Sequence, residues 1–317
     1  MNRTISRLFQ FALGLGLSSL AWAAQPLLSA QEVHAQLAND KLRVIDIRES
    51  KVYVQNHLPG ALNAPYMLWR GPSSNPGELP SLEKLTQMVQ NLGLSPQTPV
   101  VVVSSGADAS DFGASARVYW TLKLLGLPQL SVLNGGMKAW EKAGLPQEKA
   151  EAIVHTSNYQ PKINQALLAT TQELKQRLGQ PDVLLVDARP GEFFQGQTRA
   201  AAAKVPGTLP GAVDVPFSTW FEAGSAQFVP PTRARELAQT RLDLEDKEVV
   251  SFCNTGHWAA TNWFALSEVL GRKNVKLYAG SMVEWTQDPQ ALPMDHVPGR
   301  LQQLLIDAKL WSAKALR

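Results

Sequence analysis

The chain contains 317 residues, of which 44% are hydrophobic and 18% are charged, and its formal net charge is +3. The length favours two domains over one, and the composition is globular, which excludes a disordered or collagen-like chain. A charge so close to neutral gives no electrostatic basis for binding nucleic acid or an anionic membrane.

Residues 1–23 have the pattern of a secretory signal peptide. Arg3 and Arg7 precede an apolar stretch over 9–20, and Ala-Trp-Ala at 21–23 provides the small residues that signal peptidase requires. The stretch is short for a membrane span, and an N-terminal helix of the mature fold is the alternative. We expect cleavage, a periplasmic or secreted protein, and no stable membrane insertion. Losing two arginines and no acid lowers the formal charge from +3 to +1.

The rest of the chain repeats itself once, which indicates a duplicated domain. Asp-x-Arg, Leu-Pro-Gly-Ala and Gly-x-Met-x-x-Trp occur in this order in both halves, at 44–48, 57–66 and 133–140 and again at 185–189, 208–217 and 278–285. The separation is far longer than the repeats of solenoid proteins. The sequence therefore predicts an N-terminal domain over 24–148, a polar linker over 149–165 and a C-terminal domain over 166–299.

Each half alternates short apolar runs with stretches of helical spacing. We expect strands at 100–103, 130–133, 248–252 and 275–278, and helices at 112–125 and 259–270. Strand–helix–strand alternation predicts an α/β fold, with a small parallel sheet flanked by helices in each half.

The tail over 300–317 has apolar residues at roughly helical spacing. They are Leu301, Leu304, Leu305, Ile306, Leu310 and Trp311. We expect a terminal helix that packs on the domain, and a partner-binding helix is the alternative.

The only cysteine, Cys253, stands between the strand 248–252 and the helix expected from Ala259. This is the carboxyl end of a parallel strand, where open α/β sheets place their ligand sites. Backbone N–H groups of the loop and first helical turn favour an anion there, and Gly256 permits the tight curl that such a loop needs. We predict a reactive thiolate, and a buried structural thiol is the alternative.

Two families place a cysteine in such a loop. Cysteine phosphatases need an arginine six residues after the nucleophile to clamp the phosphate, and here that position is Ala259. The repeated motifs and the loop Cys-x-x-Gly-x-x-Ala instead resemble those of tandem rhodanese-like sulfurtransferases, the thiosulfate or 3-mercaptopyruvate type. The resemblance covers nearly the whole mature chain.

The resemblance implies two similar domains, with the site in the second domain near the interface and a catalytically silent first domain. Ser104 aligns with Cys253, but its loop lacks Cys-x-x-Gly and an activating base. It also implies that Cys253 is the catalytic nucleophile and that Arg189 binds substrate through its planar fork. A structural salt bridge from Arg189 to Asp187 or Glu192 is the alternative.

The loop after the cysteine is expected to bind the donor, yet it departs from the patterns of the family. Thiosulfate-preferring members resemble Cys-Arg-Lys-Gly and mercaptopyruvate-preferring members Cys-Gly-Ser-Gly, whereas this chain has Asn254 and Thr255 before Gly256. The loop cation is missing, and the donor stays open. His257 provides a switchable charge or bonds to backbone, and Trp258 belongs to the core or lines the pocket.

Together these features predict an enzyme. The Cys253 thiolate takes a sulfur atom from thiosulfate or 3-mercaptopyruvate as a persulfide and passes it to cyanide, a thiol or an exported protein. An exported persulfide carrier with little turnover, and a structural tandem domain with an inert cysteine, are the alternatives. We expect no metal and no organic cofactor, because no metal-ligand spacing joins Cys253 to His34, His57, His155 and His296.

Overall fold

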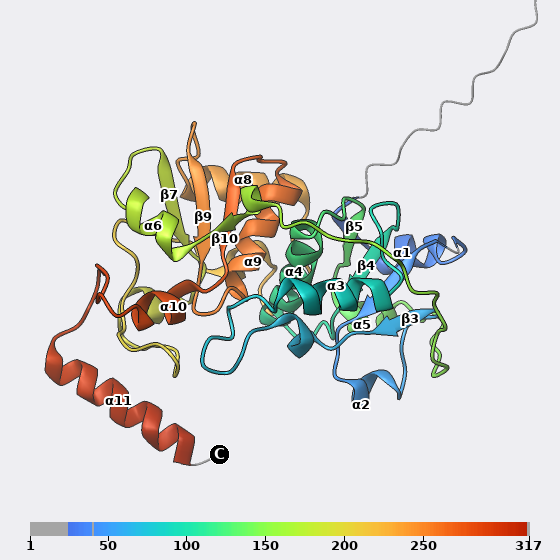
Figure 1. Ribbon diagram of the computed structural model, residues 1–317, viewed down its shortest axis with the longest axis horizontal. Helices are drawn as coiled ribbons and strands as arrows, with labels where there is room; N and C mark the ends of the chain where they lie inside the picture. Colours follow the sequence, from blue (N-terminus) through green and yellow to red (C-terminus); the bar gives the residue numbers. More distant parts are fainter. Residues whose placement is uncertain (1–24, 40, 316–317) are drawn as a thin grey trace, which may run out of the picture.

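The computed structural model describes residues 25–39 and 41–315, so the predicted signal peptide lies outside the described residues. Two five-stranded sheets, in which every paired strand is parallel, form the centres of two α/β domains that lie side by side (Figure 1). The α/β fold with two similar domains is thereby confirmed. In the part of the chain that is described, no helix is both long and apolar enough to cross a membrane.

The two sheets have the same topology. The first has the order β1-β5-β4-β2-β3, with β1 Leu27–Leu28, β2 Arg43–Asp46, β3 Ala61–Asn63, β4 Val100–Val103 and β5 Leu130–Leu133. The second has the order β6-β10-β9-β7-β8, with β6 Leu168–Ala169, β7 Val183–Asp187, β8 Val213–Asp214, β9 Glu248–Phe252 and β10 Val275–Tyr278. The four predicted strands occur at their predicted bounds, because each is an apolar run in a sheet covered by helices on both faces.

Helices cover both faces of each sheet. In the first domain they are α1 Ala30–Gln36, α2 Ser50–Tyr53, the 3-10 helix η1 Tyr66–Trp69, α3 Leu82–Asn91, α4 Ala109–Leu124 and α5 Gly136–Lys142. In the second they are η2 Gln165–Leu167, α6 Thr171–Arg177, α7 Gly191–Phe194, η3 Phe217–Trp220, α8 Pro231–Arg241, α9 Trp258–Trp263, the π-helix η4 Phe264–Val269 and α10 Ser281–Gln287. The helix expected from Phe112 begins earlier, at Ala109, because the Asp108 side chain accepts the Asp111 N–H and caps it.

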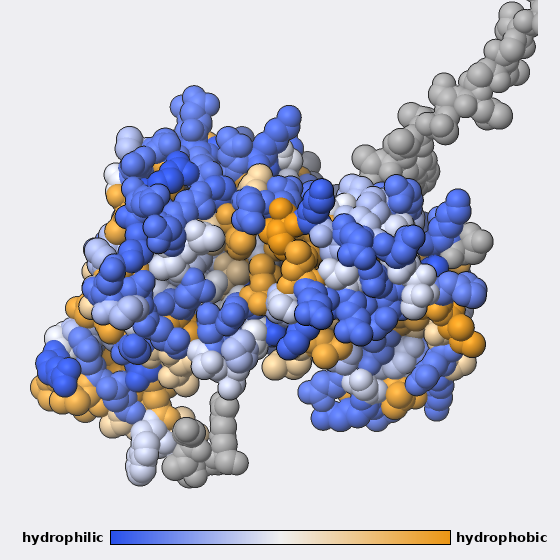
Figure 2. Space-filling model, in the orientation of Figure 1, coloured by the Kyte–Doolittle hydropathy of each residue, from blue (hydrophilic) through white to orange (hydrophobic). Residues whose placement is uncertain are grey.

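The domains meet through α4 and α9, around a cluster of aromatic rings. The ring of Phe112, from α4, lies 5.3 Å from that of Phe221 and 5.4 Å from those of Phe228 and Phe264, between centroids. These side chains belong to one buried apolar cluster that spans both domains. On the face seen in Figure 2, apolar side chains gather between two largely hydrophilic lobes. The interface is thus a shared core, which fixes the domains relative to each other.

The segment predicted as a linker follows the surface of the first domain. Residues 149–164 contain no helix or strand. Tyr159 donates from its hydroxyl to the Leu125 carbonyl at 2.8 Å and accepts at its own carbonyl from the Gln90 amide at 2.9 Å. The segment is therefore held along the domain that precedes it.

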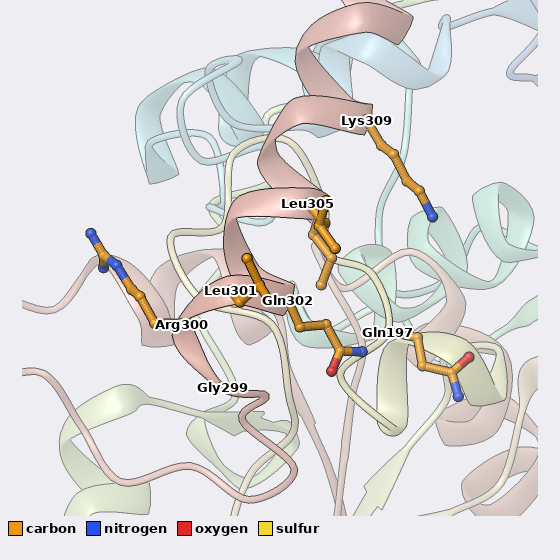
Figure 3. A pocket seen from close by; sticks show the side chains of 8 residues that line it. Gln197, Gly299, Arg300, Leu301, Gln302, Leu305 and Lys309 are labelled. Atoms are coloured by element: carbon orange, nitrogen blue, oxygen red, sulfur yellow. The ribbon is translucent and has the colours of Figure 1, made fainter.

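The predicted terminal helix forms as α11 Arg300–Ala315, which extends away from the second domain (Figure 1). Ile306 is buried, and Asp307 pairs with Arg199 at 2.8 Å. A shallow pocket of about 620 Å³ lies between the start of this helix and Gln197 (Figure 3). The other large apolar side chains of the helix are mostly exposed, namely Leu301, Leu304, Leu305 and Trp311. The packing of this helix on the domain is thus limited to Ile306 and to the ion pair of Asp307.

Candidate active site

The thiol of Cys253 lies at the floor of a pocket between the two domains. Cys253 follows β9 directly, forms no disulfide and is 1% exposed. The pocket has a volume of about 270 Å³ and is lined by Tyr66, Met67, Arg70 and Pro76 from the first domain and Cys253, Asn254, Thr255, His257 and Trp258 from the second. Both halves of the duplication therefore contribute to one site.

The loop after Cys253 curls tightly at Gly256, which has a φ of +67°. A Cβ added there would lie 2.5 Å from the carbonyl oxygen of Ala279 and closer still to the guanidinium of Arg117. Only glycine fits this position, both for its backbone conformation and for its close contacts.

Ser281 holds this curl closed. Its hydroxyl accepts the N–H of Cys253 at 3.0 Å and that of Gly256 at 3.1 Å, and it donates to the carbonyl of Tyr278 at 2.7 Å. Ser281 has a φ of +54°, in the left-handed region, and the aligned residue of the first domain is Gly136, with a φ of +58°. Glycine would adopt this backbone conformation with less strain than serine does. The serine hydroxyl instead supplies the hydrogen bonds that hold the loop.

The loop has two backbone donors that its own hydrogen bonds leave unused. The carbonyl of Cys253 accepts the N–H of Met282, and that of Asn254 accepts the N–H of Val283, both at 3.0 Å. In a trans peptide the next N–H points the opposite way, so the N–H groups of Asn254 and Thr255 point away from α10. Neither has an acceptor among the described residues. The two amides can stabilise a negative charge on sulfur.

Arg189 does not line this pocket, contrary to our expectation that it binds substrate. It is buried, its Nε and Nη2 donate to the carboxylate of Asp187 at 2.9 and 2.6 Å, and Nη2 also donates to the Gly207 carbonyl at 2.8 Å. Its Nη1 donates to the Asn254 side chain at 3.4 Å. The salt-bridge alternative describes this geometry, because the two-residue spacing lets the fork close on its own neighbour. Arg189 supports the loop from behind.

Two other arginines stand near the thiol, and both come from the first domain. Arg70, at the end of η1, lines the pocket, and its Nη2 donates to the Thr255 hydroxyl at 2.9 Å. Arg117, on α4, is buried and donates to the carbonyls of Gly256 at 3.3 Å and Gly77 at 2.8 Å. Burial lowers the pKa of Arg117 to about 10, so it stays charged at neutral pH. The cation missing from the loop is thus replaced from the other domain. No motif pointed to either residue.

His257 is bonded on both ring nitrogens. Its Nε2 lies 2.8 Å from the carbonyl oxygen of Ser110, and its Nδ1 lies 2.8 Å from the hydroxyl of Tyr66. A carbonyl can only accept, so Nε2 carries the proton and Nδ1 accepts from Tyr66. Burial, and then the positive charge of Arg70, lower the pKa of His257 to about 4. The ring is therefore neutral at physiological pH and acts as a fixed hydrogen-bonding group.

Trp258 forms one wall of the pocket. Its ring stacks on Phe217 at 5.0 Å between centroids, and its Nε1 donates to the Ser110 hydroxyl at 2.7 Å. The sequence left open whether Trp258 belongs to the core or lines the pocket, and the structure shows that it lines the pocket.

The first domain has the same loop framework, with Ser104 in the place of Cys253. Ser104 follows β4, and its carbonyl accepts the N–H of Met137 at 2.8 Å, as that of Cys253 accepts from Met282. The N–H of Gly106 donates to the carboxylate of Asp111 at 2.6 Å. A donor of this loop is thus already used by an acid of the same domain, so the loop is poorly suited to bind an anion.

Among residues 25–39 and 41–315, no cluster of three or more His, Cys, Asp or Glu side chains has the geometry to hold a metal ion. The polar groups that line the pocket are a thiol, one arginine, a tyrosine, a histidine, a threonine and an asparagine.

Comparison with known proteins identifies the family. The rhodanese-like domain family matches twice, over residues 29–143 and 170–288. The chain is 30% identical over 276 residues to a putative thiosulfate sulfurtransferase of Synechococcus elongatus, covering 84% of this chain and 83% of that one. It is 32% identical over 283 residues to a probable 3-mercaptopyruvate sulfurtransferase of Pseudomonas aeruginosa, covering 83% and 96%.

Solved structures share the fold. The 3-mercaptopyruvate sulfurtransferase SseA from Escherichia coli superposes with a TM-score of 0.70 at 21% identity, covering 81% of this chain and 99% of that one. A tyrosine-to-alanine variant of EanB, in a complex with ergothioneine, gives a TM-score of 0.76 at 20% identity, covering 86% of this chain and 71% of that one.

Proposed function

Because the chain belongs to the rhodanese-like family and is a sulfurtransferase of the rhodanese type, we propose that Cys253 is its nucleophile and carries the sulfur as a persulfide. The observation that carries this proposal is the position of the thiol. It lines a pocket shared by both domains, beside two amides that point away from α10 and have no acceptor among the described residues. The curated relatives are named as enzymes, which does not favour a carrier without turnover.

The reaction is a double displacement in which the thiolate is regenerated. The Cys253 thiolate attacks the outer sulfur of thiosulfate, a new S–S bond forms, and sulfite leaves with the electron pair of the broken S–S bond. With 3-mercaptopyruvate the C–S bond breaks instead, and the pyruvate enolate that leaves takes up the proton of the donor thiol. A thiolate or cyanide then attacks the outer persulfide sulfur, and the electron pair returns to Cys253.

The surroundings of the sulfur suit a persulfide anion. The N–H groups of Asn254 and Thr255 point away from α10, on the side of the loop where the charge develops. Arg117 lies behind the loop as a buried cation. Trp258 and Tyr66 line the pocket with aromatic rings, and charge interactions beside such low-dielectric walls are screened less than in bulk water.

A serine variant at the nucleophile tests the proposal. We expect purified Cys253→Ser to lose transfer from thiosulfate and from 3-mercaptopyruvate to cyanide, by about 1,000-fold or more. Intact-mass spectrometry of the parent incubated with donor alone should show the gain of one sulfur atom, and the variant should show none. Transfer by Cys253→Ser at the parent rate would overturn the assignment.

We also propose that the protein is exported, on the basis of the signal-peptide pattern over residues 1–23. Expression of the full chain in a Gram-negative bacterium, followed by fractionation and N-terminal sequencing, tests this. The mature chain should begin at Ala24 and be recovered in the periplasm or medium. An intact N-terminus on cytoplasmic protein would contradict the proposal.

A further inference from the structure

The pocket contains an arginine, Arg70, that pairs with no carboxylate of the described residues. Arg48 and Arg189 each pair with an aspartate two residues away, whereas Arg70 forms no salt bridge to any acid of the described chain. A guanidinium that faces a pocket without a carboxylate partner is suited to bind an anion from solution.

Arg70 also has donors to spare. Its Nε donates to the Pro76 carbonyl at 2.7 Å, Nη1 to the Tyr66 hydroxyl at 2.5 Å and Nη2 to the Thr255 hydroxyl at 2.9 Å. These bonds use three of the five N–H groups, so each Nη keeps one for a ligand. The guanidinium can therefore donate hydrogen bonds to two oxygen atoms of a ligand while it keeps these three bonds.

A chain of fixed groups aims the guanidinium. The ring Nε2–H of His257 donates a hydrogen bond to the Ser110 carbonyl, and its Nδ1 accepts one from the Tyr66 hydroxyl. The Tyr66 oxygen in turn accepts a hydrogen bond from Arg70. The guanidinium also lies 5.2 Å from the centroid of the Tyr66 ring. Since His257 is neutral, it adds no positive charge that would repel Arg70. The side chain is therefore oriented before a ligand arrives, which lowers the entropy lost on binding.

We propose that Arg70, contributed by the non-catalytic domain, binds the oxyanion group of the sulfur donor and selects for anionic donors. This rests on the proposed function of Cys253. The group would be the sulfonate end of thiosulfate or the carboxylate of 3-mercaptopyruvate, each close to the sulfur that is transferred. Arg70 thereby takes the role that the sequence suggested for Arg189, whose fork is occupied by Asp187.

The first test is kinetic. In Arg70→Gln we expect kcat/KM to fall about 10- to 100-fold, mainly through KM, for whichever of thiosulfate and 3-mercaptopyruvate the parent uses, because a charge-assisted bidentate contact is lost. Arg70→Lys keeps the charge without the fork and should be intermediate. Arg233→Gln makes the same change of charge on exposed α8, where Arg233 pairs with Glu236, and should match the parent. Parent KM values in Arg70→Gln would overturn the proposal.

The second test does not depend on turnover. Iodoacetate and iodoacetamide alkylate a thiolate by the same displacement and differ in the charge of the reagent. We expect Arg70→Gln to lower the ratio of their rates at Cys253 about 10-fold, with Arg233→Gln unchanged. A general disturbance of the loop would slow both reagents and leave the ratio intact, and that result would overturn the proposal.

The two tests distinguish a failure of the function proposed for Cys253 from a failure of the role proposed for Arg70. If the parent transfers no sulfur from any donor, the function assigned to Cys253 fails, yet the alkylation ratio still reports on Arg70. If Arg70→Gln does not fold, Arg70→Lys and Arg70→Met provide the same measurement. Because lysine keeps the charge, Arg70→Lys should keep the ratio, whereas the uncharged Arg70→Met should lower it, and an unchanged ratio in Arg70→Met would overturn the proposal.

Discussion

Ser281 offers a sharp test of how the loop around Cys253 is held. Ser281→Ala keeps the left-handed backbone and removes a hydroxyl that bonds the N–H groups of Cys253 and Gly256 and the carbonyl of Tyr278. All of this is buried, and an unsatisfied buried donor costs about 1–3 kcal/mol. We expect Ser281→Ala to lower the free energy of unfolding by about 2–4 kcal/mol.

Ser281→Gly separates the hydroxyl from the backbone strain. It removes the same bonds, but glycine adopts a φ of +54° freely, which returns about 1 kcal/mol. The glycine variant should therefore be more stable than the alanine variant by that amount, and less stable than the parent. Urea unfolding followed by tryptophan fluorescence measures all three, and sulfur transfer should fall at least 10-fold in both variants as the loop amides lose their alignment. An alanine variant as stable as the parent would refute the reasoning, as would a glycine variant less stable than alanine.

Two further predictions concern the hydrogen-bonded chain behind Arg70. The pKa of His257 is lowered from 6.5 to about 4, so the unfolded chain binds this proton more readily, and the stability associated with the neutral ring is lost as the pH falls from about 6.5 to about 4. We expect a loss of no more than about 3 kcal/mol over this window, since the ring is only partly shielded, and a smaller loss in His257→Gln. Equal pH dependence of the two proteins in chemical denaturation would contradict the role of the ring. Tyr66→Phe should raise the KM for the donor about 3- to 10-fold, which is a smaller increase than in Arg70→Gln. The variant removes a hydrogen bond that orients the guanidinium but keeps the charge of Arg70. A larger effect than that of Arg70→Gln on the alkylation ratio would mean that the tyrosine itself contacts the anion.

The strands and the duplication could be predicted because their signals are local or repeated. The run Val100–Val103 and its counterpart Glu248–Phe252 are buried on both faces, and such runs are recognisable without knowing their neighbours. Cys253 was found for the same reason, since its position between strand and helix is a property of adjacent residues.

Arg189 shows how a local pattern can mislead. Asp-x-Arg occurs in both halves, and in the first half Arg48 pairs with Asp46 at 2.6 Å, in a domain without a nucleophile. A motif shared by a catalytic and a silent domain is better explained by the fold that both have in common. The repeat therefore favours the structural interpretation of Arg189, because the same ion pair recurs in the half that has no cysteine.

Arg70 could not be predicted, for a physical reason. Its distance from Cys253 is set by the packing of α4 on α9 and by the path of the chain after η1, neither of which has a sequence pattern. A cation within the Cys-x-x-Gly loop would be predictable, because the same stretch of backbone would position both the cation and the thiol. Here the loop has Asn254 and Thr255, and the positive charge comes from the other domain, so donor binding depends on the domain interface.

The first domain is thus silent only in the sense that it lacks a nucleophile. Because it supplies the charge, a substitution in the aromatic cluster at Phe112 should weaken donor binding without touching the pocket.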